Sequence, residues 1–264
     1  MNQSGHDEIR QAVRNRYKSI VMQSGREGSC CSAGEVAGTC AAPDEVSAKL
    51  GYSPEELAAV PQGANLGLGC GNPQAIAALR PGETVLDLGS GGGFDCFLAS
   101  RQVGAAGHVI GVDMTPEMVS QARRNALKGS FANTDFRLGE IEHLPVADGT
   151  VDVIISNCVI NLSPDKTQVY REAYRVLKPG GRIAVSDVVA MFPLPEGVKG
   201  DMEALANCIS GASTVDELER MLRESGFTQI SIEPKGESKT FIKDWEPGSN
   251  LEDYVLSAVI QAVK

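Results

Sequence analysis

Several features that mark particular protein classes are missing from this chain of 264 residues. No uninterrupted apolar run approaches the roughly 18 residues that a membrane-spanning helix needs, so we expect no membrane segment. The opening residues lack a basic region followed by an apolar core, so we expect no secretory signal. The net charge is −10 and no part of the chain has a surplus of Lys and Arg, which argues against a nucleic acid or an anionic membrane as partner. A small, neutral or cationic substrate suits this charge better.

The cysteines lack the C-x2-C and C-x-H pairings that indicate a zinc site, and their number, seven, is odd. With no export signal, we expect a cytoplasmic protein whose thiols stay reduced. They are therefore candidate ligands or reactive groups, except that Cys96 falls within an expected helix and is interpreted as core packing. The other six are Cys30, Cys31, Cys40, Cys70, Cys158 and Cys208.

Apolar strands alternate with helices from residue 83 onward, which is typical of a parallel sheet with helices on both faces. We expect strands at 84–88, 108–113, 134–138, 151–156, 182–189, 227–233 and 254–263. We expect helices at 7–22, 54–60, 73–79, 94–103, 116–128, 165–177, 200–210 and 214–225. The first of these helices is amphipathic and predicts one packing face and one solvated basic face.

Three parts of the chain differ in composition. Residues 1–72 form an N-terminal extension that includes a Cys-rich loop at 24–45 without periodicity. Residues 73–192 form the core of the α/β unit, and residues 193–264 hold an insert followed by the last strands of the same sheet.

A glycine-rich loop follows the first strand of this unit and reads Asp87-Leu88-Gly89-Ser90-Gly91-Gly92-Gly93. In open α/β sheets ligands bind outside the carboxyl ends of strands, and glycine lets the backbone approach them. The dinucleotide pattern G-x-G-x-x-G is not met because residue 94 is Phe, so we expect a ligand without a pyrophosphate. Asp113 ends the second strand, where a carboxylate can accept hydrogen bonds from both ribose hydroxyls. Together these features predict an adenosine-type ligand.

Residues 84–190 resemble the class I S-adenosylmethionine-dependent methyltransferases. The resemblance rests on the glycine loop, the acid after the second strand, Gly139-Glu140-Ile141-Glu142, Ser156-Asn157 and Leu177-Lys178-Pro179-Gly180-Gly181. It implies a Rossmann-like, doubly wound α/β sheet of seven strands with the last strand antiparallel, an N-terminal helical and loop extension, and a helical insert after the fifth strand.

The same resemblance implies which residues bind S-adenosylmethionine. Asp87 and the loop would line the methionine moiety, Asp113 and Met114 the ribose and adenine, and Ile141 and Glu142 the adenine edge. Asn157 would stand near the reacting methyl group. The implied cofactor residues are Asp87, Gly89, Ser90, Gly91, Gly93, Asp113, Met114, Ile141, Glu142 and Asn157.

Three cysteine segments look like those of the arsenite methyltransferases, and the likeness includes the Cys-Cys loop near residue 30. The segments are Leu68-Gly69-Cys70-Gly71-Asn72-Pro73, Ser156-Asn157-Cys158-Val159-Ile160-Asn161-Leu162 and Asn207-Cys208-Ile209-Ser210-Gly211-Ala212. The resemblance implies that Cys70, Cys158 and Cys208 bind As(III). It also implies that one or two of Cys30, Cys31 and Cys40 capture arsenite first or form a disulfide with Cys70 during turnover.

Thiol chemistry agrees with this interpretation, because trivalent arsenic is soft and prefers thiolates. Three thiolates leave its lone pair free to accept a methyl group from S-adenosylmethionine. We expect arsenite, methylated arsenite and their thiol conjugates as substrates, with glutathione or a thioredoxin-type protein as reductant. Two alternatives stay open: methylation of a small organic substrate such as a quinone-like carbon or a thiol, and non-catalytic binding of a metalloid.

Overall fold

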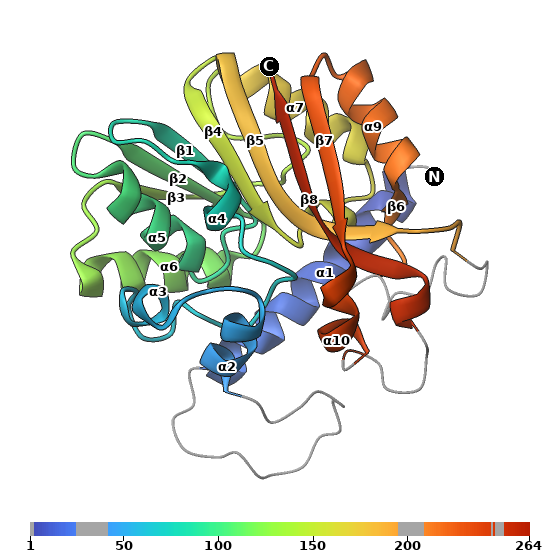
Figure 1. Ribbon diagram of the computed structural model, residues 1–264. Helices are drawn as coiled ribbons and strands as arrows, with labels where there is room; N and C mark the ends of the chain where they lie inside the picture. Colours follow the sequence, from blue (N-terminus) through green and yellow to red (C-terminus); the bar gives the residue numbers. More distant parts are fainter. Residues whose placement is uncertain (1–2, 25–41, 195–208, 244, 246–250) are drawn as a thin grey trace.

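The computed structural model describes residues 3–24, 42–194, 209–243, 245 and 251–264. A mixed, twisted sheet lies at the centre of the molecule (Figure 1). Its main strands are β1 (Thr84–Leu88), β2 (His108–Asp113), β3 (Thr134–Leu138), β4 (Val151–Asn157), β5 (Leu177–Ala190), β7 (Thr228–Lys235) and β8 (Val255–Val263). Their order is β3-β2-β1-β4-β5-β8-β7, and the short β6 (Ser213–Thr214) pairs with the end of β5.

The last strand, β8, runs antiparallel to both of its neighbours, β5 and β7. The pairs formed by β1 with β2, β1 with β4, β2 with β3 and β4 with β5 are all parallel. The expected α/β class, a doubly wound sheet whose last strand is antiparallel, is therefore confirmed.

Helices cover both faces of the sheet and one of its ends. They are α1 (Gln3–Ser24), α2 (Pro43–Lys49), α3 (Pro54–Ala58), α4 (Gln74–Ala77), α5 (Phe94–Val103), α6 (Pro116–Gly129), α7 (Lys166–Val176), α9 (Val215–Glu224) and α10 (Lys239–Ile242), with short 3-10 turns at η1 (Ile160–Leu162), η2 (Gly236–Ser238) and η3 (Leu251–Asp253). No helix within the described ranges is both long and apolar enough to cross a membrane.

Alternation along the strands divides the core between the two faces. Val85 on β1 packs in one apolar cluster with α4, α5 and α6, whereas its neighbour Leu86 packs in another with α7 and α9. Successive side chains of a strand point to opposite faces, and a strand buried on both faces is apolar almost throughout. This is the physical basis of the near-continuous apolar runs in the sequence.

Side-chain caps fix where several helices begin. Ser53 and Glu56 form a reciprocal capping box at the start of α3, and Thr214 and Glu217 form another at the start of α9. Asp165 caps α7 by accepting a hydrogen bond from the backbone N–H of Gln168. Such caps satisfy backbone donors that the helix itself leaves open.

Some elements differ from the sequence-based expectation. The loop expected to run to residue 45 is already helical from Pro43, with Asp44 and Glu45 in the favourable first turn of α2. The fifth strand begins at Leu177 rather than at 182 because Leu177 already pairs with Val151 of β4. The register then shifts before Arg182 pairs with Val153. Most of the helix expected at 200–210 lies outside the described residues.

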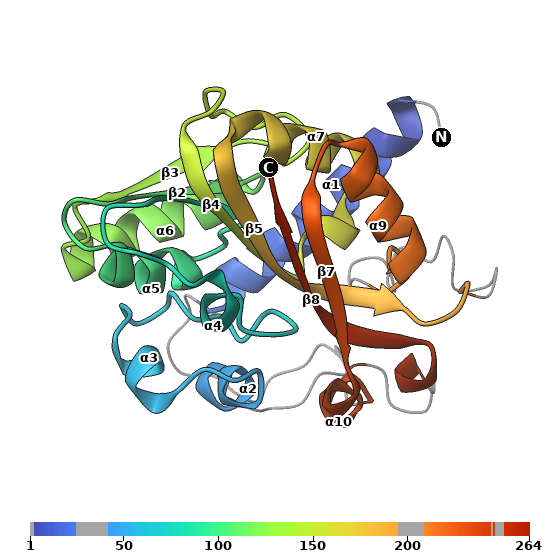
Figure 2. The same ribbon diagram turned by 45° about the horizontal axis from the view of Figure 1, so that its top comes forward.

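The long helix α1 runs past the carboxyl ends of the central strands and reaches α6, and α2, α3 and α10 gather at the same end (Figures 1 and 2). Val13 of α1 is 1% exposed and shares an apolar cluster with Cys70 and Cys158. The N-terminal helix therefore covers the end of the sheet at which ligands bind in this type of fold.

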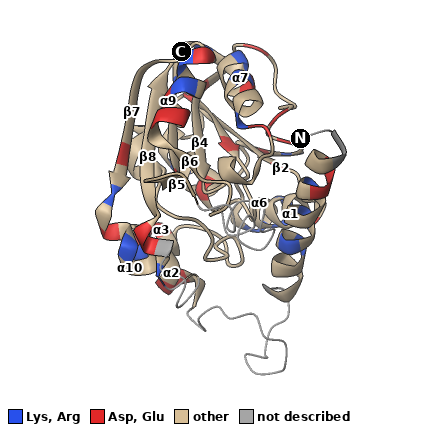
Figure 3. Cartoon of the chain, turned by 90° about the vertical axis from the view of Figure 1, so that its right-hand side faces the viewer, with Lys and Arg blue, Asp and Glu red and all other residues tan. Residues whose placement is uncertain are grey.

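The basic face of α1 is not simply solvated, contrary to expectation. Arg10 pairs with Glu140 at 3.3 Å and with Glu142 at 3.4 Å. Arg14 also pairs with Glu140, and Lys18 pairs with Glu117 of α6. Figure 3 shows the basic positions along α1, which lies beside α6. These acidic residues all lie within residues 73–192, so charge complementarity between α1 and this part of the chain helps to hold the helix in place.

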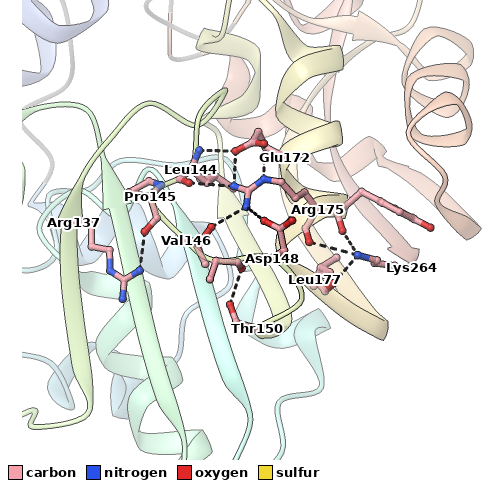
Figure 4. A network of polar contacts seen from close by, with 12 residues as sticks. Arg137, Leu144, Pro145, Val146, Asp148, Thr150, Glu172, Arg175, Leu177 and Lys264 are labelled. Atoms are coloured by element: carbon pink, nitrogen blue, oxygen red, sulfur yellow. Dashed lines mark hydrogen bonds and ion pairs between the residues drawn. The ribbon is translucent and has the colours of Figure 1, made fainter.

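A second polar network ties α7 to the loop between β3 and β4 (Figure 4). The guanidinium of Arg175 donates to Glu172 and Asp148 and to the carbonyl oxygens of Leu144 and Val146. Bidentate bonds of this kind combine charge with fixed geometry. The network sets the position of the loop that follows the third strand.

Candidate functional site

The site lies where the chain connections diverge around β1. This strand pairs with β2 on one side and with β4 on the other. Open α/β sheets bind ligands in the crevice at such a switch point, beside the loops that follow the two diverging strands. The glycine loop follows β1, and Cys158 follows β4. Residues that are about 70 positions apart in sequence therefore meet at one edge of the sheet.

The glycine loop adopts a conformation that side chains disfavour. Gly89, Gly91 and Gly93 have φ values of +73°, +50° and +94°. A Cβ at Gly89 would lie 2.4 Å from a methyl carbon of Val159, so the close approach to the segment after β4 requires glycine there. The loop thus packs directly against the chain that carries Cys158.

Asp113 holds the glycine loop in place. Its Oδ2 accepts a hydrogen bond from the N–H of Gly91 at 3.0 Å, and its Oδ1 accepts one from the N–H of Thr115 at 2.8 Å. Burial raises the pKa of this carboxyl, while the two backbone donors act in the opposite direction. Each carboxylate oxygen retains a lone pair that could accept a ligand hydroxyl.

The side chain of Ser90 indicates that the glycine loop suits a polar ligand. Its hydroxyl is buried and has no hydrogen-bond partner among the described residues. A buried hydroxyl without a partner costs free energy, which a polar ligand atom beside it would recover. The loop therefore fits the polar groups of an S-adenosyl ligand.

Two buried carboxylates flank this loop. Burial, followed by the charge of Asp95, raises the pKa of Asp87 well above its usual range. Burial raises the pKa of Asp95 to about 6. The thiol of Cys96 is fully buried in the core and donates to Oδ2 of Asp87 at 3.2 Å. A cationic ligand beside this pair would relieve the repulsion, and the sulfonium of S-adenosylmethionine is a cation.

The loop after β3 places two further expected cofactor residues. Ile141 is 9% exposed and Glu142 is 3% exposed. An oxygen of Glu142 accepts from the Ser163 hydroxyl at 2.7 Å and pairs with Arg10. Met114, at the end of β2, packs against the apolar cluster that contains Cys158. Met114 follows β2, and Ile141 and Glu142 follow β3, so all three lie at the same end of the parallel sheet as the glycine loop.

Cys70 and Cys158 lie together despite the 88 positions between them in the sequence. Both side chains are buried, and their sulfur atoms lie within 4.8 Å of each other and of a carboxylate oxygen of Asp187. The remaining expected arsenic ligand and the three cysteines of the N-terminal loop, Cys208, Cys30, Cys31 and Cys40, lie outside the described residues.

The backbone at Cys158 is unusual. Its φ of +58° is left-handed, a region in which a residue with a Cβ is strained. The N–H of Cys158 donates to the carbonyl oxygen of Ser186 on β5 at 2.8 Å, which holds this conformation. Strain that is held in place by neighbouring strands is frequent at functional sites.

Asp187 is a site residue that sequence reasoning missed. Its carboxylate accepts hydrogen bonds from the N–H groups of Ile160, Asn161 and Val188 and from the Asn161 side chain. Burial raises its pKa to about 6. The sequence does contain one signal, because Asp187 is an acid in a mostly apolar strand. That strand, β5, pairs with β4, which precedes Cys158.

Hydrogen bonds on both sides fix the Cys70 loop. The N–H of Cys70 donates to Oδ1 of Asn157 at 3.0 Å, and Nδ2 of Asn157 donates to the carbonyl oxygen of Gly71 at 2.8 Å. The Ser257 hydroxyl on β8 donates to the carbonyl oxygen of Cys70 at 2.6 Å. The Asn157 amide is thus committed to the thiol loop, whereas the resemblance implies a place near the reacting methyl group.

A family model described as a methyltransferase domain matches residues 79–226. The arsenite methyltransferase of Halobacterium salinarum is 54% identical over 267 aligned positions, which cover 98% of this chain and 67% of that protein. The chain belongs to the arsenite methyltransferase family. The arsenite methyltransferase of Aquipseudomonas alcaligenes is 39% identical over 83% of this chain, which spans 62% of that protein. The arsenite methyltransferase of Mus musculus is 34% identical over 84% of this chain, which spans 58% of that protein.

Solved structures agree with the fold. The crystal structure of an arsenic(III) S-adenosylmethionine methyltransferase from Chlamydomonas reinhardtii has a TM-score of 0.62 and 35% identity, and the match covers 84% of this chain and 74% of that one. A phosphoethanolamine methyltransferase of Haemonchus contortus, at 19% identity and a TM-score of 0.59, shows the fold alone. The protein is therefore a class I S-adenosylmethionine-dependent methyltransferase.

Proposed function

We propose that this protein transfers a methyl group from S-adenosylmethionine to As(III) bound by cysteine thiolates and so produces methylated arsenicals. The observation that carries this proposal is the pair of buried thiols, Cys70 and Cys158, at the crevice beside the glycine loop. The names of the most similar relatives support arsenite as the substrate.

S-adenosylmethionine supplies a methyl group on a positively charged sulfur when it is bound. We assign its methionine moiety to Asp87 and to loop residues Gly89, Ser90, Gly91 and Gly93, its ribose and adenine to Asp113 and Met114, and the adenine edge to Ile141 and Glu142. The unpartnered hydroxyl of Ser90 and the open lone pairs of Asp113 support this assignment. In our account Asn157 acts by positioning Cys70.

Cys70 and Cys158 provide two of the sulfur ligands, and Cys208 is our candidate for the third from the sequence alone. Ionising one thiol at pH 7 costs roughly 2 kcal/mol, or about 6 kcal/mol for three. Thiolate-rich structural zinc sites release on the order of 10–16 kcal/mol, so binding of a thiophilic atom can offset this cost. Pyramidal arsenic keeps its lone pair, and no general base is required on the nucleophile.

The main task of the protein is to hold the two substrates in position. Cys70 and Cys158 are buried, and hydrogen bonds to their backbones hold both residues in place. Holding reactants in an attack geometry can contribute roughly 7–11 kcal/mol to lowering the barrier. In the proposed division of labour, residues 73–192 bind the cofactor, while residues 1–72 and 193–264 contribute thiols and cover the site.

Arsenic gives up two electrons when its lone pair forms the bond to carbon, so a full cycle needs a reductant. We propose that a pair of protein thiols, Cys70 with one of Cys30, Cys31 or Cys40, supplies these electrons by forming a disulfide. Glutathione or a thioredoxin-type protein would then reduce the disulfide. A reducing compartment, the cytoplasm, suits this chemistry.

Methylation assays on cysteine variants test the proposal. We expect Cys70→Ser and Cys158→Ser to lose at least about a hundredfold of arsenite methylation, because misplacing a reacting atom has an effect of this size. The affinity for S-adenosylmethionine should change little. The matched control is Cys96→Ser, which alters a buried thiol in the core and retains a donor to Asp87. Full arsenite methylation by Cys158→Ser would rule out the proposal.

A further inference from the structure

Tyr52 connects the cofactor side and the thiol side of the site through hydrogen bonds. The residue lies between α2 and α3 and is 3% exposed. Its hydroxyl donates to Oδ1 of Asp95 at 2.8 Å and accepts from Nδ2 of Asn157 at 3.1 Å. Asp95 lies in the first turn of α5, directly after the glycine loop, and Asn157 ends β4. One phenolic oxygen therefore bridges the two loops of the crevice.

The line of hydrogen bonds continues from Asn157 to Cys70. Asn157 bonds the N–H of Cys70 through Oδ1 and the carbonyl oxygen of Gly71 through Nδ2. A Cβ at Gly69 would lie 2.7 Å from Nδ2 of Asn157, so the loop and the amide are in tight contact. Because both ends of the amide are engaged, a rotation of this side chain would displace the backbone of Cys70.

Packing alone does not account for this arrangement. The Tyr52 ring already packs against Phe94, with ring centroids 4.8 Å apart, and phenylalanine would make the same contact. Asp95 is a carboxylate placed in a buried position, which costs free energy unless a ligand or partner compensates it. Gln74 also donates to the Asp95 carbonyl oxygen and so helps to fix this turn.

We propose that Tyr52 is a positioning residue that couples occupancy of the glycine loop to the placement of Cys70, so that cofactor and arsenite bind cooperatively. This inference rests on the proposed function. A ligand on the loop contacts the turn that leads into α5 and thereby restrains Asp95. Tyr52 and Asn157 transmit this restraint to Cys70. The coupling is reciprocal, so arsenite must tighten cofactor binding by the same factor.

Calorimetric binding of S-adenosylhomocysteine, which has no methyl group to transfer, tests the coupling with and without arsenite. In the wild type we expect arsenite to tighten binding by about fivefold or more. In Tyr52→Phe this ratio should fall to about one, and kcat/KM for arsenite methylation should fall about tenfold because a buried hydrogen bond to a carboxylate is lost. If Tyr52 only stabilised the fold, Tyr52→Phe would lower the free energy of unfolding and leave the effect of arsenite on S-adenosylhomocysteine affinity unchanged.

The control is Tyr170→Phe, which removes another buried phenolic hydroxyl, one without a hydrogen-bond partner in the described part of the chain. This variant should keep the wild-type ratio. If Tyr52→Phe does not fold, Asn157→Ala breaks the next link and carries the same expectation. A wild-type ratio in Tyr52→Phe, or a ratio of one in the wild type, overturns the coupling. Failure of the proposed function would differ, because the wild type would then bind S-adenosylhomocysteine without methylating arsenite.

Discussion

Buried carboxylates dominate the chemistry of the site at the scale of single residues. Asp87 and Asp95 flank the glycine loop, and Asp187 lies beside the two thiols. None of these three side chains is more than 9% exposed. A structure selected for stability alone would avoid such groups, so their presence is consistent with binding of a cationic cofactor and with precise placement of thiols.

The pH dependence of stability tests the burial of Asp95. Its pKa of about 6 in the folded protein exceeds the usual value of 3.8, so the folded state binds the proton more tightly than the unfolded state. The stabilisation from this proton is complete below about pH 4 and is lost as the pH rises through about 6. Between pH 4.5 and 7, we expect ligand-free wild type to lose about 2 kcal/mol relative to Asp95→Asn.

Urea unfolding of both proteins across this pH range measures the effect. Both proteins share every other titrating group, so their difference reports Asp95 together with its charge interaction with Asp87. A difference in unfolding free energy that stays constant from pH 4.5 to 7 would show that the carboxyl is not perturbed by burial.

Helix α1 is the element whose role depends most on charge. The Arg10 side chain is 16% exposed and pairs with the Glu142 side chain, which is 5% exposed. The Lys18 side chain is 53% exposed and pairs with Glu117. An ion pair that is largely removed from water leaves an uncompensated charge when one partner is deleted, while an exposed pair contributes little. The end of α1 near Arg10 should therefore anchor the helix.

Alanine substitutions distinguish these two contacts. We expect Arg10→Ala to lower the free energy of unfolding by about 1–3 kcal/mol, because Glu142 loses a partner in a buried position. Lys18→Ala should cost at most about 0.5 kcal/mol. Urea unfolding gives both values, and hydrogen exchange should show faster opening of α1 in Arg10→Ala. Equal losses in the two variants would mean that the pair near Arg10 does not anchor the helix.

The sequence predicts most elements because their signals are local. The strand β1 and the helix α5 have the expected bounds, since a short apolar run and a helix after glycine are both evident in the chain. The helix α2 escapes prediction because its seven residues follow a long segment without periodicity. Tyr52 and Asp187 escape it as well, because their importance comes from partners far away in the sequence.

At the scale of the whole molecule, strand order creates the site. Cys158 follows β4 and Asp187 lies on the adjacent β5, while Cys70 reaches the same place through contacts with Asn157 and Ser257 on β8. Spacing along the chain cannot show this convergence, because it depends on which strands pair. The resemblance to a known family implied it, and the structure shows the two described thiols side by side.

X-ray absorption at the arsenic edge tests the central claim most directly, because it counts the sulfur neighbours of bound As(III). The account predicts three sulfur neighbours in the wild-type protein and a lower count in both Cys70→Ser and Cys158→Ser, with Cys96→Ser unchanged. An arsenic environment that is the same in the wild type and in both of these serine variants would contradict the claim that Cys70 and Cys158 hold the substrate.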